Sequence, residues 1–171
     1  LEPSDYNKYV MNSFQAYLDG DSNELLNIKK KYKRWINAKI SSDNNFFLKS
    51  KIKLMGDWKD HIKFDPISNF PITSLKVKIS DEGSISGFKN FRLILPEARL
   101  SESEIFFTTL LRFVDLPAYY TKLVNVKFNG NNYVALLQED ASKEFLERSN
   151  LSEFPILKTN EFTFYLDKKS A

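Results

Sequence analysis

The stretch NFFLKSKIKLM, Asn45 to Met55, decides the fold class of this chain because its apolar and basic residues alternate. A two-residue period places successive side chains on opposite faces of a β-strand. The preceding stretch KRWINAKI, residues 33–40, alternates as well, and the polar cluster at 41–45 separates the two. Two alternating runs joined by turn-forming residues predict a β-hairpin, whose second strand ends at Gly56.

Further extended segments follow this hairpin along the chain. Residues 57–72 contain two prolines and little periodicity, which predicts a loop. Asn129-Gly130 is a strong signal for the turn of a second hairpin. Together these patterns predict strands at 74–80, 89–95, 119–128 and 133–137, and an extended segment at 155–166.

Helical signals occur before, between and after these strands. Aromatic and aliphatic residues recur at three- and four-residue spacing from Tyr6 to Leu18, and Ser22 can cap a second short helix. Ser101 and Glu104 have the spacing of a capping box, which predicts a helix over the following residues to 114. A last helix is expected after a cap at 140 or 142.

The order of these elements predicts an α+β fold with a mostly antiparallel sheet. The central helix crosses between the fourth and fifth strands, and helices precede the sheet. We expect a helical N-terminal segment at 1–32 and an α+β domain at 33–171. The chain begins with Leu1 rather than Met, so we expect it to be part of a longer protein.

The composition is that of a folded domain with a sizeable core. Apolar residues make up 42% of the 171 residues, which is too many for a disordered chain. The absence of cysteine excludes disulfides and cysteine-based zinc sites. No apolar run approaches the ~20 residues of a membrane span, and no signal peptide is visible.

The small positive net charge of +3 is unevenly distributed. Five basic residues fall within 29–34, and Lys49, Lys51 and Lys53 alternate along the predicted strand. Such clusters can bind phosphates or nucleic acid, but a solvated helix end and strand face is the more common explanation. We therefore do not expect a nucleic-acid partner.

The motif GDWKDH, residues 56–61, gathers residues that could carry chemistry. Asp57, Asp60 and His61 are suitable metal ligands, and Asp57 with His61 could form an acid/base pair. No second histidine and no recognisable nucleophile accompany them, so neither a metal site nor hydrolase chemistry is expected. The favoured interpretation is a hydrogen-bonded loop anchored by Trp58.

Three further charged residues are candidates for a nucleotide site. Lys78 on a strand and Glu104 at the start of the central helix could form an ion pair that positions a phosphate contact, although two surface charges explain them more simply. Glu139 ends an apolar strand, where a carboxylate can line a cleft or favour a helix start. No Walker, GxGxxG, HExxH, GxSxG or kinase catalytic-loop signature is present.

Five stretches of the chain, taken in order, resemble the CotH kinase family, the spore-coat H-like proteins of bacteria. The resemblance covers roughly residues 33–166, and its strength is in the series rather than in any one motif. The matching stretches are KIKLMGDWKDH (51–61), SLKVKI (74–79), SISGFKNFRLILPEAR (84–99), SEIFFTTLL (103–111) and VNVKFNGNNYVALLQEDASKEFLE (124–147).

The resemblance implies a fold similar to protein kinases and transfer of phosphate from ATP to Ser residues of secreted or surface proteins, with Mg²⁺ or Mn²⁺. The chain would be the N-lobe-like, nucleotide-cradling portion, with a secreted or cell-envelope location. Lys78 would contact the ATP phosphates, Glu104 would orient Lys78, and Glu139 would line the cleft. Lys76, Lys89 and Arg92 are competing phosphate contacts. Further residues that match the family pattern are Gly56, Asp57, Trp58, Asp60, His61, Lys89, Arg99, Asn129 and Gly130.

Two departures from the family pattern limit these expectations. The family's return strand carries a glycine before an aliphatic residue and Tyr, whereas this chain has Tyr133-Val134-Ala135. Residues 140–171 are too few for a second lobe with a catalytic Asp and metal ligands, so the fragment alone is expected to be inactive. The alternative is a noncatalytic surface module whose basic hairpin, Lys33 to Lys53, contacts an acidic polymer or a partner protein.

Overall fold

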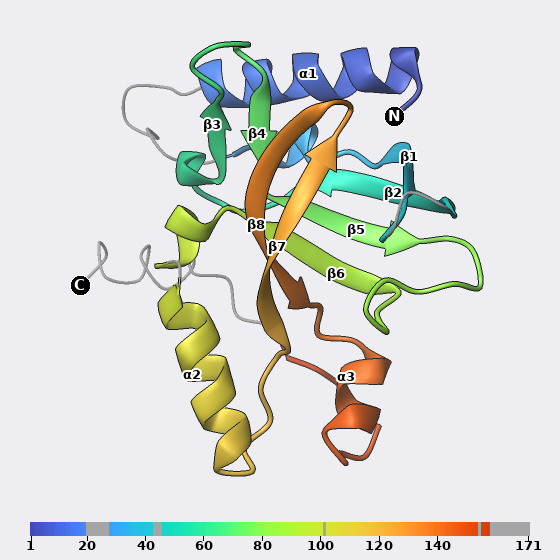
Figure 1. Cartoon of the computed structure of the whole chain (residues 1–171), viewed down its shortest axis with the longest axis vertical. Coiled ribbons are helices and arrows are strands. Elements are labelled where there is room, and N and C mark those ends of the chain that lie inside the picture. Colours follow the sequence, from blue (N-terminus) through green and yellow to red (C-terminus); the bar gives the residue numbers. More distant parts are fainter. Residues whose placement is uncertain (20–27, 43–45, 101, 154, 158–171) are drawn as a thin grey trace. The chain divides into compact units, whose positions relative to one another are not determined.

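The computed structural model describes residues 1–19, 28–42, 46–100, 102–153 and 155–157 (Figure 1). It divides into two compact units, Leu1–Asp140 and Ala141–Ala171. None of the helices in the described ranges is long and apolar enough to cross a membrane. Four expectations lie wholly or partly outside the described residues: the helix after Ser22, the turn at 43–45, the cap at Ser101 and the extended segment beyond 157.

The first unit contains a six-stranded sheet in which every neighbouring pair is antiparallel. The prediction of an α+β fold with a mostly antiparallel sheet is therefore confirmed. The strand order is β1-β2-β5-β6-β8-β7, so β6 pairs with β8 although β7 comes next in the chain. The strands are β1 (Ile36–Ile40), β2 (Leu48–Leu54), β5 (Leu75–Ile79), β6 (Asn90–Ile94), β7 (Thr121–Phe128) and β8 (Asn131–Glu139).

Both predicted hairpins are present. β1 and β2 pair with Ala38 opposite Ser50, which confirms the hairpin inferred from their alternation. Asn129 and Gly130 both adopt positive φ, 45° and 95°, in the turn between β7 and β8. Asparagine and glycine tolerate this left-handed conformation better than other residues, which is why they form the tight turn.

Residues 57–72 are not the simple loop that the sequence predicted. They contain η2 (Lys59–His61) and a two-stranded ribbon of β3 (Ile62–Phe64) and β4 (Pro71–Thr73). Strands of three residues are too short to show a period, and Pro71 is tolerated because it is the first residue of its strand. The Asp65 carboxylate accepts the backbone N–H of Ser68 at 2.7 Å and so closes the turn of the ribbon.

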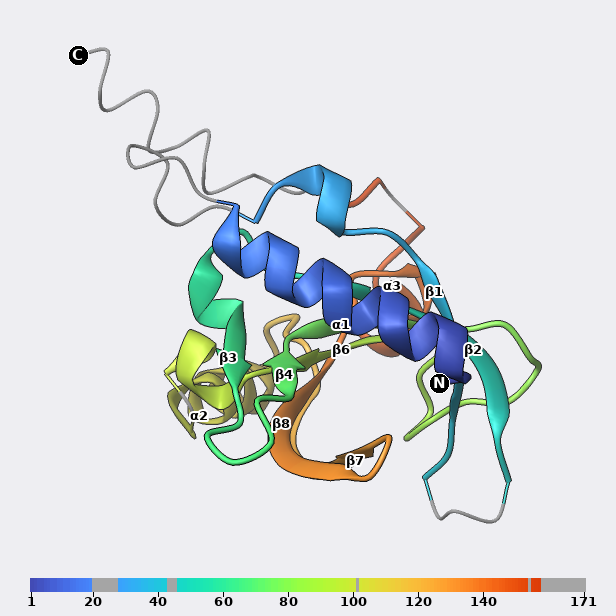
Figure 2. The same ribbon diagram turned by 90° about the horizontal axis from the view of Figure 1, so that it is seen from above.

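Helix α1 (Pro3–Leu18) belongs to the core of the first unit, although the sequence analysis grouped residues 1–32 as a separate segment. The Tyr9 hydroxyl donates to the carbonyl of Pro71 at 2.8 Å, and its ring lies 4.8 Å from that of Phe128. In Figure 2, which looks down on the molecule, α1 lies in front of the strands. A short helix, η1 (Lys30–Tyr32), precedes β1. α1 therefore covers one end of the sheet and its ribbon.

Two further helical elements lie between β6 and β7, and one lies in the second unit. The turn η3 (Pro96–Arg99) leads into α2 (Glu102–Phe113), the predicted central helix. In the second unit, α3 (Lys143–Arg148) begins after Ser142, one of the two caps proposed from the sequence, but the Ser142 side chain makes no capping hydrogen bond. The Lys143 ammonium group pairs with Glu153 at 2.6 Å.

Candidate functional site

Over β1, β2, β5 and the start of β6, the two faces of the sheet have opposite character. One face is apolar and buried, and includes Ile52, Val77 and Phe91 at the centre of the core. Because side chains alternate along each strand, the intervening residues project from the other face. That face carries seven cations from four adjacent strands: Lys39 of β1, Lys49, Lys51 and Lys53 of β2, Lys76 and Lys78 of β5, and Arg92 of β6.

The strand register aligns three of these cations in one row. Lys53 lies opposite Lys76, and Lys76 lies opposite Arg92. Arg92 in turn lies opposite Gln138 on β8. Neighbouring strands are about 4.8 Å apart, so these side chains are held close together. Lys53, Lys76 and Arg92 are called the cationic row below.

Like charges directly opposite each other on adjacent strands destabilise a sheet. The basic face contains four such pairs, and each stands in the register of its strands. The pairs are Lys39 with Lys49, Lys51 with Lys78, Lys53 with Lys76, and Lys76 with Arg92. A face that brings so many cations together is suited to binding an anionic ligand.

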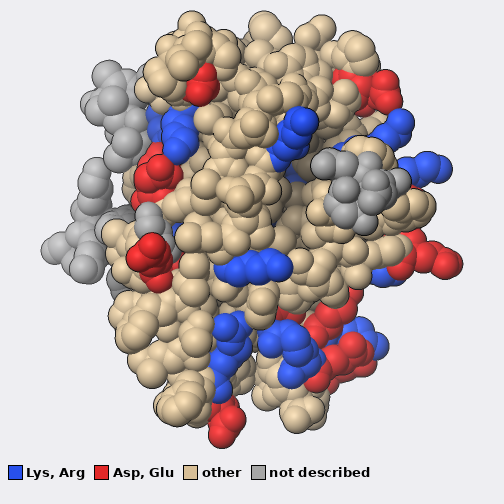
Figure 3. Space-filling model, viewed as in Figure 1, with Lys and Arg blue, Asp and Glu red and all other residues tan. Residues whose placement is uncertain are grey.

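Several basic residues elsewhere in the described parts of the chain stand beside a carboxylate. Figure 3 shows Lys and Arg side chains next to Asp or Glu at several places on the side of the molecule drawn there. Lys63, for example, pairs with Glu97 at 2.9 Å, and Lys8 pairs with Asp5 at 3.0 Å. Ion pairs of this exposed kind contribute little to binding or stability.

Asp140 is the carboxylate that faces the cationic row. It is buried, forms an ion pair with Lys76, and accepts hydrogen bonds from the Arg92 guanidinium at 2.6 and 3.1 Å. Burial alone would raise the pKa of Asp140, but the hydrogen bonds from Lys76 and Arg92 lower it to about 2. Asp140 is therefore ionised at neutral pH and fixes the geometry of two cations, while the row of three cations keeps an excess of positive charge.

Lys53 is the third member of the row and is not held by Asp140. Burial lowers its pKa, and the neighbouring charges of Lys76 and Lys33 lower it further. Its ammonium nitrogen lies 4.7 Å from the centre of the Trp35 ring. An additional negative charge near Lys53 would relieve this repulsion, which again favours an anionic ligand.

The structure does not join Lys78 to Glu104, the ion pair considered from the sequence. Lys78 is exposed and lies opposite Lys51 and Asn90, two residues along β5 from the cationic row. The Glu104 carboxylate instead accepts a hydrogen bond of 2.7 Å from the Gln138 amide. Glu104 thus contacts the side chain that stands opposite Arg92, which brings α2 to the end of the cationic row.

Glu139 is buried and projects from the face opposite to Gln138. Its carboxylate accepts the backbone N–H of Tyr120 at 3.3 Å, and its own N–H donates to the Tyr120 carbonyl at 3.0 Å. These contacts extend the pairing of β7 and β8 by one residue. They place Glu139 away from the cationic row, on the other face of the sheet.

Lys89, Arg99 and the Asn129-Gly130 turn lie outside the cationic row. Lys89 is exposed just before β6, and Arg99 is half-buried at the end of η3. The turn lies at the start of β8, whereas Gln138 is near the end of the same strand. The residues that match the family pattern therefore lie on several different surfaces of the fold.

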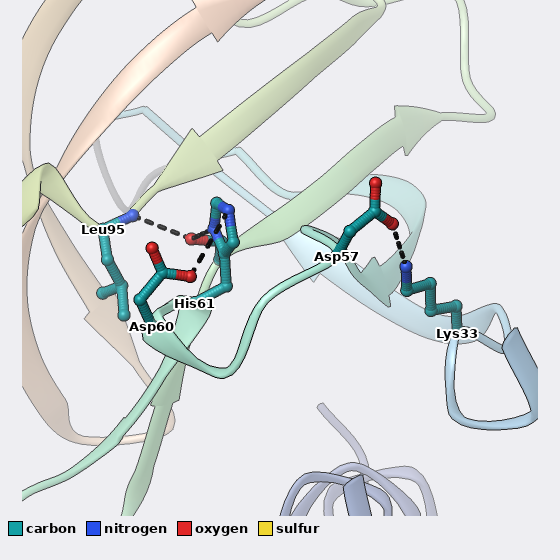
Figure 4. Close-up of polar contacts among 6 residues, drawn as sticks. Lys33, Asp57, Asp60, His61 and Leu95 are labelled. Atoms are coloured by element: carbon teal, nitrogen blue, oxygen red, sulfur yellow. Dashed lines mark hydrogen bonds and ion pairs between the residues drawn. The ribbon is translucent and has the colours of Figure 1, made fainter. Parts of the chain in front are cut away.

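The motif at 56–61 forms a braced loop, drawn in Figure 4. His61 is buried, and its Nδ1 is hydrogen-bonded to the hydroxyl of Ser74 at 2.8 Å. The same hydroxyl accepts the backbone N–H of Leu95 at 2.9 Å. Gly56 has a φ of 90°, and a Cβ at this position would lie 2.0 Å from the His61 ring. Only glycine leaves room for the ring, so the motif fastens the end of β2 to β5 and β6.

The acidic residues of this motif make separate contacts. Asp57 accepts a hydrogen bond from Lys33 at 2.7 Å, and Asp60 lies 4.0 Å from Nε2 of His61 (Figure 4). Burial lowers the pKa of His61 more than the Asp60 charge raises it, so the ring is neutral at neutral pH. Within the described ranges, no group of three or more His, Cys, Asp or Glu side chains gathers in a metal-binding arrangement. These contacts are those of a structural brace.

No family model, curated protein or solved structure matches this chain. The resemblance to the CotH kinase family therefore stays a prediction, and the candidate site rests on its own geometry.

Proposed function

We propose that the basic face of this chain binds the phosphate groups of ATP, and that the chain is the nucleotide-cradling N-terminal part of a CotH-type protein kinase. The substrates would be Ser residues of surface proteins, and the metal ion would be Mg²⁺ or Mn²⁺. The observation that carries the proposal is the cationic row, in which Lys53, Lys76 and Arg92 face one another across adjacent strands.

Phosphate is the anion that best suits this row. Arginine and lysine make charge-assisted hydrogen bonds to phosphate oxygens, and a triphosphate offers several oxygens to cations on successive strands. Asp140 holds the Lys76 and Arg92 side chains before a ligand arrives, which reduces the entropy lost on binding. We assign the main phosphate contacts to Lys76 and Arg92, in preference to Lys78.

The likeness to a protein-kinase N-lobe is part of the same proposal. In protein kinases a strand lysine contacts the phosphates and pairs with a glutamate of a packed helix. Here Glu104 of α2 accepts a hydrogen bond from Gln138, whose position in β8 is opposite Arg92, so the helix carboxylate lies near the end of the row. Phosphoryl transfer would additionally need a catalytic base and metal ligands, which we expect from a second lobe.

Titration calorimetry of the full chain with ATP and Mg²⁺ or Mn²⁺ tests the proposal. We expect at least tenfold weaker binding in Lys76→Met or Arg92→Met, because each variant removes a phosphate contact worth about 1.4 kcal/mol or more. Lys63→Met is the matched control, since Lys63 lies on β3, away from the basic face, and pairs with Glu97 at 2.9 Å. Unchanged ATP binding in both row variants would refute the assignment.

A noncatalytic module that binds an acidic polymer is the second candidate. It is favoured by the lysines outside the row, because Lys49, Lys51 and Lys78 extend the basic face along β2 and β5 away from the cationic row. Poly-L-glutamate is a suitable probe. Strong binding of this polymer, lost in Lys49→Met/Lys51→Met and not displaced by ATP, would support the module over the kinase.

A further inference from the structure

The aromatic ring of Trp35 stands at the outer end of the cationic row. Ile36 lies opposite Ile52 and faces the core, so the preceding residue, Trp35, projects from the basic face beside Lys53. The ammonium group of Lys53 is 4.7 Å from the centre of the Trp35 ring, which confirms the placement. The row therefore runs from an aromatic ring through three cations.

Trp35, one of the two tryptophans in the chain, is 42% exposed. β1 is an edge strand, so among the described strands none lies beyond the ring, and a shallow pocket there is lined by Trp35 and by residues of α1 such as Met11. The apolar residues that fill the core at this position are Ile36 and Ile52. A large flat side chain that is half open to solvent and adjacent to a phosphate-type site is suited to stacking on a nucleobase.

We infer that the base of the bound nucleotide stacks on the face of the Trp35 ring that Lys53 does not cover, with the phosphates extending along the row to Lys76 and Arg92. This inference rests on the proposed function. The ligand class is a nucleoside triphosphate lying across β1, β2, β5 and β6, at right angles to the strands. Lys53, between the ring and the other two cations, contacts the phosphate nearest to the nucleoside.

The length of the row agrees with this orientation. Three strand spacings separate β1 from β6 in the sheet order, which is about 14 Å. An extended nucleoside triphosphate covers a comparable distance between its base and its terminal phosphate. A free triphosphate without a nucleoside would occupy only the cationic end.

Tryptophan fluorescence gives a direct test. Trp58→Phe leaves Trp35 as the single tryptophan, and this variant is titrated with ATP and, separately, with tripolyphosphate. We expect ATP to quench the emission strongly and to bind about tenfold more tightly than tripolyphosphate, because stacking on an aromatic side chain contributes roughly this factor per base. Tripolyphosphate should leave the emission nearly unchanged.

Two variants of Trp35 complete the test, with calorimetry as the readout. Trp35→Ala should weaken ATP binding about tenfold and leave tripolyphosphate binding unchanged, while Trp35→Phe should retain most of the ATP affinity. If Trp35→Ala does not fold, the quenching data and Trp35→Phe still decide the question.

The outcomes separate this inference from the proposed function. Equal affinities for ATP and tripolyphosphate, both lost in Arg92→Met, would retain the phosphate site and overturn the role of Trp35. An equal loss of both ligands in Trp35→Ala would mean that the ring only positions Lys53. If neither ATP nor tripolyphosphate binds, the phosphate site and the stacking platform are both overturned.

Discussion

Replacing Asp140 by Asn is the most informative perturbation of the basic face. The variant keeps the size of the side chain and removes the charge that faces Lys76 and Arg92. The pKa of Asp140 is about 2 in the folded chain, against an ordinary value of 3.8. A difference of this size corresponds to about 2 kcal/mol of stability at neutral pH. We expect Asp140→Asn to lose at least this amount, because two cations are left facing each other.

The pH dependence of this loss follows from the direction of the pKa shift. The folded-state pKa is lower than the unfolded one, so the contribution of Asp140 is complete above pH 3.8 and disappears as the pH falls toward 2. The difference in unfolding free energy between the native chain and Asp140→Asn should therefore be largest at pH 7. It should shrink at pH 3, where protonation of the native carboxyl has begun.

Urea denaturation of the full chain at pH 7 and pH 3 measures this difference. Glu97→Gln is the matched control, since Glu97 also pairs with a lysine but its side chain is 65% exposed. We expect the control to change stability by less than about 0.5 kcal/mol. Equal stability of Asp140→Asn and the native chain at pH 7, or an equal loss at both pH values, would refute the reasoning.

The remaining predictions concern the brace around His61. Gly56→Ala should destabilise the chain by about 3 kcal/mol or more, because its Cβ would lie 2.0 Å from the His61 ring. Gly130→Ala should cost only about 1 kcal/mol, because Gly130 also has a positive φ but a Cβ there would meet open space. Chemical denaturation of the two variants compares these losses. Ser74→Ala should cost about 1–3 kcal/mol because it leaves the Leu95 N–H and the His61 ring nitrogen without their shared partner, and thermal unfolding measures this loss. An NMR titration should find the midpoint of His61 below 6.5, with stability decreasing at lower pH because the buried ring resists protonation. The first expectation is contradicted if Gly56→Ala loses no more stability than Gly130→Ala. The second is contradicted if Ser74→Ala loses no stability, and the third if the titration midpoint of His61 lies above 6.5.

The parts of the fold that the sequence predicted are those with a local signal. The first hairpin was predictable because five to seven residues alternate on each strand, and the second because Asn129 and Gly130 favour positive φ. The ribbon of β3 and β4 was missed because three residues do not establish a period. Its turn at Asp65 depends on side-chain hydrogen bonds, which the strand and turn preferences of the individual residues do not predict.

The cationic row was only partly predictable. Alternation places Lys76 and Lys78 on one face, but it does not say which of them stands opposite Arg92, because that depends on the register between β5 and β6. Asp140 was interpreted as a helix cap, since it precedes Ser142 in a stretch that reads as a helix start. Its partners are 64 and 48 residues distant in the chain (140 minus 76 and 140 minus 92), and tertiary packing alone brings them together.

The like-charged pairs on the basic face also have a kinetic consequence. A field of one sign accelerates the encounter of an anion with the surface, and salt suppresses this acceleration. The Debye length at 0.1 M salt is about 10 Å, which is close to the spacing of two strands from Lys53 to Arg92. The association rate constant of any anionic ligand should thus decrease steeply between low and physiological salt, while ligand residence time, set by the direct contacts, should change much less.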